Sequence, residues 1–348
     1  AMVYASFFEL PAGLERFGPF FLRIRQYEQS TVYAVLLYLF GTALPQGRAT
    51  QDDLARICQV IESYLLRRFV CRMSTKKYNH VFLGLVAKLG KLPKVTAEAF
   101  ERLLASYRGE SEKWPSDSEF RRHWAVEQLY AGGNRRKTVQ AMLSAIDQAI
   151  QPAFGEGAVF PYHALTVEHV LPEEWERNWP LEGLPECVRG RFEPGTSDRE
   201  IRGTLLNSIG NLTLVTQKLN TSLKNAPYAE KRAKLFASST LPLNRHFQEC
   251  DSWNEEAILQ RAEALFETAR ILWPGPPDVR PAGPNGRADG AQPDSASDTP
   301  PQSGRDTRAA GPEPAIPPDP NLRQELVELL NGQPDDESLR RVLEREPA

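Results

Sequence analysis

The sequence predicts a mainly α-helical protein with a small α+β part, and three observations support this fold class. Apolar residues recur with helical spacing through most of residues 1–148. Two short segments rich in β-branched and aliphatic residues follow, ALTVEHV at 164–170 and NLTLV at 211–215, and such composition is typical of strands. Helical patterns return after the second strand and end near residue 273. We therefore expect an all-α domain at 1–148 and a second domain with two strands at 149–273.

The helices expected in the first domain have recognisable start signals. The segment STVYAVLLYLFGTAL has Ser30 as its N-cap and is expected to stop near Gly41. The segment TQDDLARICQVIESYLLRRFVCRM has Thr50 as its N-cap, followed by Asp52 and Asp53, whose negative charges suit a helix N-terminus. Further helices are expected at 78–90, 96–107, 117–130 and 137–150.

The region after the first strand contains a long stretch without a helical pattern. Residues 173–205 carry several prolines and glycines, and we expect them to be irregular. Helices are expected at about 217–225, 227–237 and 254–273.

The C-terminal region changes composition abruptly. Nearly half of the chain's 28 prolines lie in 274–320, with Gly, Ser and Asp between them. Such a segment cannot bury enough apolar surface to offset its ordering entropy, so we expect a disordered linker. Residues 321–348 are expected to form two short amphipathic helices that dock on this chain or on a partner.

The bulk composition excludes some classes of protein and limits others. A formal net charge of −3 gives no global signature of nucleic-acid binding, so any such site must be a local patch. The cysteines Cys58, Cys71, Cys187 and Cys250 lie far apart, which indicates reduced thiols of a cytoplasmic protein rather than a disulfide framework or a zinc site. The sequence contains no run of about 18 apolar residues, so it predicts no membrane span.

Four polar residues on the two strands and the following helix form a candidate catalytic site. The first strand ends in an acid–histidine pair, Glu168 and His169; the second begins at Asn211; and the helix after it carries Asn220. Taken alone, the pair also fits a half-buried core histidine beside a solvated glutamate. In this order, however, the elements resemble the ββα-metal motif of HNH nucleases. A neutral imidazole can take a proton from water near pH 7, so we expect His169 to be the general base.

The remaining polar residues of the motif suit a metal site. The Glu168 carboxylate and the Asn220 amide oxygen are ligands that a hard cation prefers, and we expect them to hold one Mg²⁺ or Mn²⁺ per active site. Asn211 is expected to act as a brace that hydrogen-bonds the loop backbone and keeps His169 in orientation.

Two basic runs are candidates for binding DNA phosphates. The first contains Lys218, Lys224, Lys231 and Arg232, for which a solvated charged helix face is the alternative. The second includes Arg67, Arg68 and Arg72. It would either continue a DNA track or form an ion-pair network between the two domains.

The chain also resembles a known family. Residues 146–273 resemble the HNH-type C-terminal domain of the GmrSD and SspE-like family of bacterial restriction and phage-defence proteins. The resemblance rests on EHVLP at 168–172, GNLTLVTQKLN at 210–220 and SLKNAPYAEKRAKL at 222–235. Residues 30–150 resemble the helical segment that precedes this domain.

The resemblance implies a metal-dependent endonuclease that nicks double-stranded DNA and acts in phage defence. The family's N-terminal sensor and nucleotide-hydrolysing domain has no counterpart here, so we expect it to be a missing partner within the same protein. One metal centre with one general base cuts one strand per engagement, so double-strand breaks would need a second active site, for instance from a homo-oligomer. The alternative is a degenerate HNH fold that binds DNA or a protein partner without cleavage.

Overall fold

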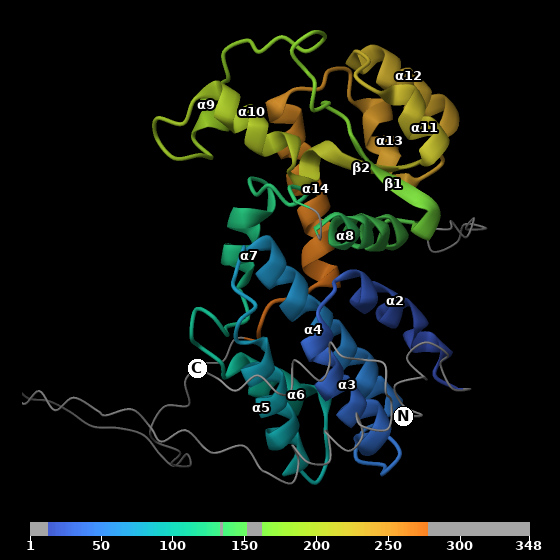
Figure 1. Ribbon diagram of the computed structural model, residues 1–348, viewed down its shortest axis with the longest axis vertical. Coiled ribbons are helices and arrows are strands. Elements are labelled where there is room, and N and C mark those ends of the chain that lie inside the picture. Colours follow the sequence, from blue (N-terminus) through green and yellow to red (C-terminus); the bar gives the residue numbers. More distant parts are fainter. Residues whose placement is uncertain (1–12, 133–134, 152–161, 278–348) are drawn as a thin grey trace, which may run out of the picture.

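The computed structural model describes residues 13–132, 135–151 and 162–277 (Figure 1). The first part is built from η1 (Glu15–Phe17), α2 (Gly18–Gln26), η2 (Ser30–Val32), α3 (Tyr33–Tyr38), η3 (Leu39–Ala43), α4 (Gln51–Val70), α5 (Tyr78–Gly90), α6 (Ala97–Ala105), α7 (Asp117–Trp124) and α8 (Arg135–Ala149). The second part contains η4 (Tyr162–Ala164), β1 (Leu165–His169), α9 (Glu186–Arg189), α10 (Asp198–Leu206), η5 (Ile209–Asn211), β2 (Leu212–Thr216), α11 (Gln217–Leu223), α12 (Tyr228–Ser238), α13 (Pro242–Glu249) and α14 (Glu255–Leu272). The fold is therefore mainly α with one small sheet, as expected.

Helix α4 forms as its sequence predicts. The Thr50 side chain accepts from the Asp53 amide, and the Asp53 carboxylate accepts in return from the Thr50 amide, which closes a capping box. The expected apolar positions face the interior, and all are buried: Leu54, Ile57, Val60, Ile61, Tyr64 and Leu65. Local signals were sufficient here because cap and periodicity agree.

Several expectations about helices were wrong. Ser30 is the first residue of η2 rather than a cap, the helix expected at 117–130 ends at Trp124, and α13 was not expected. The helix expected to stop near Gly41 continues through that glycine as a π-helical turn, η3. The stretch 173–205, expected to be irregular, contains α9 and most of α10. Helix α10 has its own capping box, in which Ser197 Oγ accepts from the Glu200 amide and the Glu200 carboxylate accepts from the Ser197 amide. The neighbouring prolines and glycines concealed this start signal.

The sheet consists of β1 and β2, which run antiparallel. Glu168 lies opposite Thr213, and His169 lies opposite Leu212. Because side chains alternate along a strand, Glu168 and His169 point to opposite faces of the sheet. Helices α8 and α11 pack against both strands, and α13 packs against β2.

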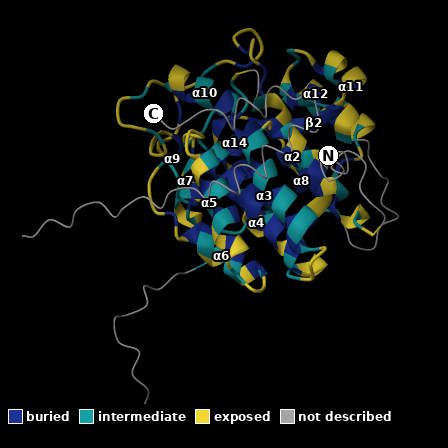
Figure 2. Cartoon of the chain, turned by 60° about the horizontal axis from the view of Figure 1, so that its bottom comes forward, coloured by how far each residue is buried: buried dark blue, intermediate teal, exposed yellow. Residues whose placement is uncertain are grey.

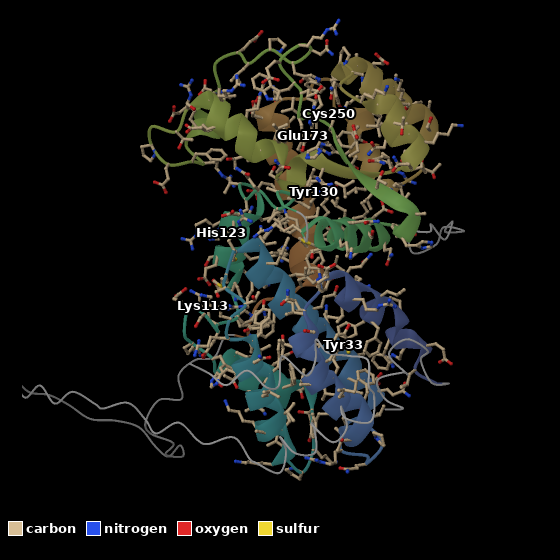
Figure 3. The ribbon with its side chains drawn as sticks, in the orientation of Figure 1. Tyr33, Lys113, His123, Tyr130, Glu173 and Cys250 are labelled. Carbon is tan, nitrogen blue, oxygen red and sulfur yellow. The ribbon has the colours of Figure 1, made fainter. Side chains whose placement is uncertain are left out.

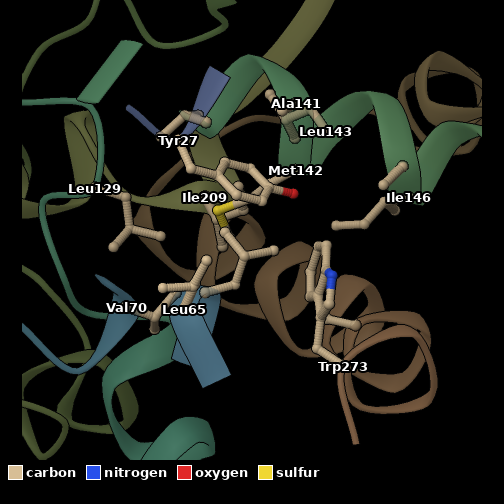
Figure 4. Close-up of a cluster of buried hydrophobic side chains, with 14 of the residues drawn as sticks. Tyr27, Leu65, Val70, Leu129, Ala141, Met142, Leu143, Ile146, Ile209 and Trp273 are labelled. Carbon is tan, nitrogen blue, oxygen red and sulfur yellow. The ribbon is translucent and has the colours of Figure 1, made fainter. Parts of the chain in front are cut away.

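The two expected domains share one hydrophobic core. Helix α14 runs from the strand-bearing part to the helical part (Figure 1) and packs against α7, α8 and η5. Figure 4 shows the Trp273 side chain beside residues of α4, α8 and η5. Buried residues gather along the central helices, and exposed residues lie on the outer loops (Figure 2). Packing is therefore continuous across the boundary that the sequence predicts at 148/149.

The second basic run belongs to this junction. Arg67 is fully buried, and its guanidinium donates to the Trp273 carbonyl at 2.8 Å and to the Asp117 carboxylate. Arg68 is also buried and donates to backbone carbonyls of the 111–113 loop. Both arginines are thus used inside the chain, but of these contacts only the bond from Arg67 to Trp273 joins the two expected domains, and the Arg67–Asp117 ion pair lies within the first.

The C-terminal expectations fall almost entirely outside the described residues. Only 274–277 of the expected linker are described, and there the Ser63 hydroxyl donates to the Pro274 carbonyl at 2.6 Å. The rest of the linker and the helices expected at 321–348 lie beyond the described part. No helix within the described ranges has both the length and the apolar character needed to cross a membrane.

Candidate active site

The site is organised around the C-terminal end of β1. His169 is the last residue of the strand, and the chain then leaves it through Val170, Leu171 and Pro172. The Val170 amide donates to the main-chain carbonyl of Asn211 at 3.0 Å, so the exit from β1 is attached to the entry of β2. Pro172 offers no amide to extend the ladder.

Asn211 makes the contacts expected of a brace. It is fully buried, and its Oδ1 accepts from the Leu171 amide at 2.8 Å and from Trp253 Nε1 at 3.0 Å. Its Nδ2 donates to the carbonyls of Leu171 and Leu206, each at 2.9 Å. The side chain therefore ties the loop after β1 to η5 and to the segment before α14. Its part in catalysis stays a prediction.

His169 lies in a largely closed environment that still reaches solvent. Its side chain is 14% exposed, and its ring meets the Tyr130 ring edge-on with centroids 5.3 Å apart. His169 Nε2 lies 3.2 Å from Asn207 Oδ1 and 3.9 Å from Glu173 Oε1. An amide oxygen can only accept, so Nε2 carries the proton in this arrangement and Nδ1 keeps the lone pair.

The electrostatic environment keeps this imidazole neutral. Burial lowers the pKa of His169 most strongly, and Lys231 and Arg136 lower it further. Asn207 and Glu173 act in the opposite direction but do not reverse the shift. The neutral form is the one that accepts a proton.

Three residues around His169 were missed by the sequence analysis. Asn207 caps α10, Tyr130 follows α7, and Glu173 lies just after Pro172. The Tyr130 amide donates to the Asn207 carbonyl at 3.2 Å, which joins two of them. Figure 3 labels Tyr130 and Glu173, both toward the half of the molecule that contains β1. Only Glu173, four residues beyond His169, had a signal in the sequence.

Of the two expected metal ligands, Glu168 is already paired within the chain, whereas the amide oxygen of Asn220 is not used by its hydrogen bonds. Glu168 is buried and its Oε1 lies 2.6 Å from the Nζ of Lys231, so a cation of the chain itself already neutralises this carboxylate. Asn220 Nδ2 donates to Thr166 Oγ1 and to the Val167 carbonyl, each at 3.3 Å, and neither bond uses Oδ1, the atom expected to bind the cation. In the described part of the chain, no cluster of three His, Cys, Asp or Glu side chains is placed to hold a metal.

The first basic run divides into two groups. Lys218 and Lys224 are exposed, and no ion pair of theirs occurs within the described ranges. Lys231, which we expected to bind DNA phosphates, is 1% exposed, so that expectation is wrong for this conformation. Arg232 donates to the carbonyls of Phe247 and Gln248 and pairs with Asp251.

Replacing the brace should destabilise the protein. Asn211→Ala would leave the Leu171 amide and carbonyl, the Leu206 carbonyl and the Trp253 indole without their buried partner. Since each unsatisfied buried group costs about 1–3 kcal/mol, we expect a loss of about 3 kcal/mol or more in the free energy of unfolding, measured by urea denaturation. The control is Asn178→Ala, which removes one solvent-exposed hydrogen bond, to the Asn225 carbonyl, and should cost no more than about 1 kcal/mol. Equal effects of the two variants would contradict this account of Asn211.

Comparison with known proteins agrees with the family expected from the sequence. No curated protein matches the chain. Residues 114–268, however, match the family model described as the C-terminal domain of GmrSD restriction endonucleases. The match begins at Trp114, upstream of the expected start at 146, and so includes α7 and α8, which pack with α14 in the structure. Residues 114–268, which include α7, α8, both strands and most of α14, are therefore similar to the C-terminal domain of GmrSD restriction endonucleases.

Proposed function

We propose that the chain is a DNA endonuclease effector of a restriction or phage-defence system, with His169 as its general base. The single observation that carries the proposal is the placement of His169 at the end of β1, where its ring is partly accessible and Nε2 faces Asn207 Oδ1, so that Nδ1 is left to accept a proton. The restriction-endonuclease domain at 114–268 supports double-stranded DNA as the substrate. The N-terminal sensor domain implied by the family resemblance would direct the cleavage.

The geometry suggests how this chain would promote hydrolysis. Nδ1 of His169 would accept a proton from the attacking water, while Nε2–H keeps donating to Asn207 Oδ1, which fixes the ring. Asn211 would hold the strand end, so that the imidazole keeps its orientation as substrate arrives. A single base of this kind acts on one phosphodiester at a time, so nicking is the proposed elementary reaction.

The proposed activity includes the requirement for Mg²⁺ or Mn²⁺ that the family resemblance implies. When bound, such a cation supplies charge stabilisation to the phosphate. Glu168, as it is placed here, does not support its assignment as a ligand, whereas the hydrogen bonds of Asn220 leave its Oδ1 unused. Exposed Lys218 and Lys224 are the side chains proposed to hold DNA phosphates nearby.

The nuclease proposal is tested by conversion of supercoiled plasmid to open circle in Mg²⁺, in Mn²⁺ and in EDTA. We expect metal-dependent nicking that falls by at least about 100-fold in His169→Ala, since general-base catalysis contributes about 10²–10⁴-fold. His163→Ala, a substitution of an exposed histidine on η4, is the matched control and should retain activity. DNA binding without nicking in any metal would instead favour the non-cleaving module.

The pH dependence of nicking follows from the lowered pKa of His169. A general base works when deprotonated, and a lowered pKa keeps it deprotonated at lower pH. We therefore expect kcat to stay on its plateau down to about pH 6.5, the ordinary pKa of histidine, and to fall only below it. A kcat that already declines between pH 8 and 7 would contradict this assignment of the base.

The salt dependence of binding tests the two exposed lysines. Each phosphate contact contributes about −0.9 to the slope of log affinity against log salt for duplex DNA. Lys218→Ala/Lys224→Ala should therefore make the slope less negative by roughly 2, measured by fluorescence anisotropy with a DNA duplex. Lys91→Ala/Lys94→Ala, which removes two exposed lysines between α5 and α6, is the control. Equal slopes for wild type and the Lys218/Lys224 variant would exclude these residues from the interface.

A further inference from the structure

A buried lysine holds the end of β1 from the face opposite the His169 ring. Lys231 comes from α12, and its Nζ lies 2.6 Å from Glu168 Oε1 and 2.7 Å from the main-chain carbonyl oxygen of His169. Both side chains of the pair are buried. A buried charge is stable only when paired and hydrogen-bonded, so each member requires the other.

The other polar groups on this face are also satisfied within the chain. Thr213, opposite Glu168 in the register, hydrogen-bonds Asn244 of α13. Asn244 Nδ2 donates in turn to the Leu214 carbonyl at 2.9 Å. With α12 supplying Lys231 and α13 supplying Asn244, two helices close the face on which Glu168 lies.

This arrangement leaves no place for a second cation on Glu168. A divalent ion bound to that carboxylate would lie beside the Lys231 ammonium, and like charges repel strongly where water is excluded. The positive charge expected from a metal at the end of β1 is already supplied by Lys231. The Lys231 ammonium also contacts the main-chain carbonyl of His169. A metal ion bound to the Glu168 side chain alone would not make this contact.

We propose that Glu168 and Lys231 are positioning residues that form a clamp on the end of β1, and that Glu168 is not a metal ligand. Lys231 holds the His169 carbonyl, and Glu168 holds Lys231 in place. The effect on His169 rests on the proposed function, whereas the statement that Glu168 binds no metal does not depend on it.

Metal binding without catalysis tests the proposal first. Mn²⁺ is titrated into wild type and Glu168→Gln, and free Mn²⁺ is followed by electron paramagnetic resonance. We expect the two affinities to agree within about threefold. If neither protein binds Mn²⁺, Glu168 holds no metal, and the proposal stands.

A tenfold or greater loss of Mn²⁺ affinity in a folded Glu168→Gln protein would overturn it. Tighter Mn²⁺ binding by Lys231→Met than by wild type would support it, because removing the ammonium would open Glu168 to a cation that Lys231 excludes in the wild type. Neither outcome requires cleavage, so this test is independent of the nicking assay with His169→Ala.

The clamp itself is tested by a double-mutant cycle on stability. Glu168→Gln and Lys231→Met should each lower the folding equilibrium constant by roughly a hundredfold, because each leaves a buried charge unpaired. The double variant should recover at least about tenfold of that loss. The control cycle uses Glu230 and Lys234 of the same helix, whose ion pair is partly exposed and should show little coupling. Additive effects at 168 and 231 would contradict the clamp.

Kinetics separate positioning from general stability. Measured where each protein is fully folded, Lys231→Met should lower kcat for nicking by at least about tenfold and leave KM for DNA unchanged. Lys231→Arg, which keeps a charged donor, should recover part of that loss. Unchanged kcat in folded Lys231→Met would show that the pair only stabilises the fold and would overturn its positioning role.

Discussion

The packing of α14 against the η5 turn is the constraint on which the rest of the site depends. A side chain at position 210 would meet the Ile258 carbonyl of α14 at close to bonding distance, so only glycine allows this approach. Arg261, one turn further along, donates to the carbonyls of Gly210 and Leu212 at 2.7 Å each. The turn, and Asn211 within it, is therefore fixed by a helix that also reaches the helical part of the molecule.

Two connections join the η5 turn to the candidate general base. Asn211 joins the turn to the loop after β1, and β1 ends at His169. Burial in this network has an electrostatic effect as well as a mechanical one. Arg261 has no carboxylate partner within the described ranges, and burial lowers its pKa to about 9. Lys231 lies behind β1. Burial of the His169 ring and the positive charge of Lys231 both lower the pKa of the imidazole and favour its neutral form.

The sequence predicted what is local and missed what is brought together by folding. The start of α4, both strands and the residues His169 and Asn211 followed from caps, alternation and motif order. The contact between Lys231 and Glu168 joins residues 63 positions apart, and no spacing rule covers such a distance. Asn207 is likewise 38 positions from His169, on a helix that the surrounding prolines and glycines concealed. The polar residues that tune the site thus come from tertiary contacts.

The burial of Lys231 could nevertheless have been predicted from the sequence. In α12, Lys231 lies one turn before Leu235, and residues four apart share a helix face. Leu235 is buried, so the same face places the lysine stem inside, whereas Lys234 lies off that face and pairs with Glu230 near solvent. A lysine on the apolar face of a helix needs an internal carboxylate, and Glu168, on a mostly apolar strand, is that carboxylate. A run of basic residues in a nuclease therefore has to be divided by helix face before any of it is assigned to DNA.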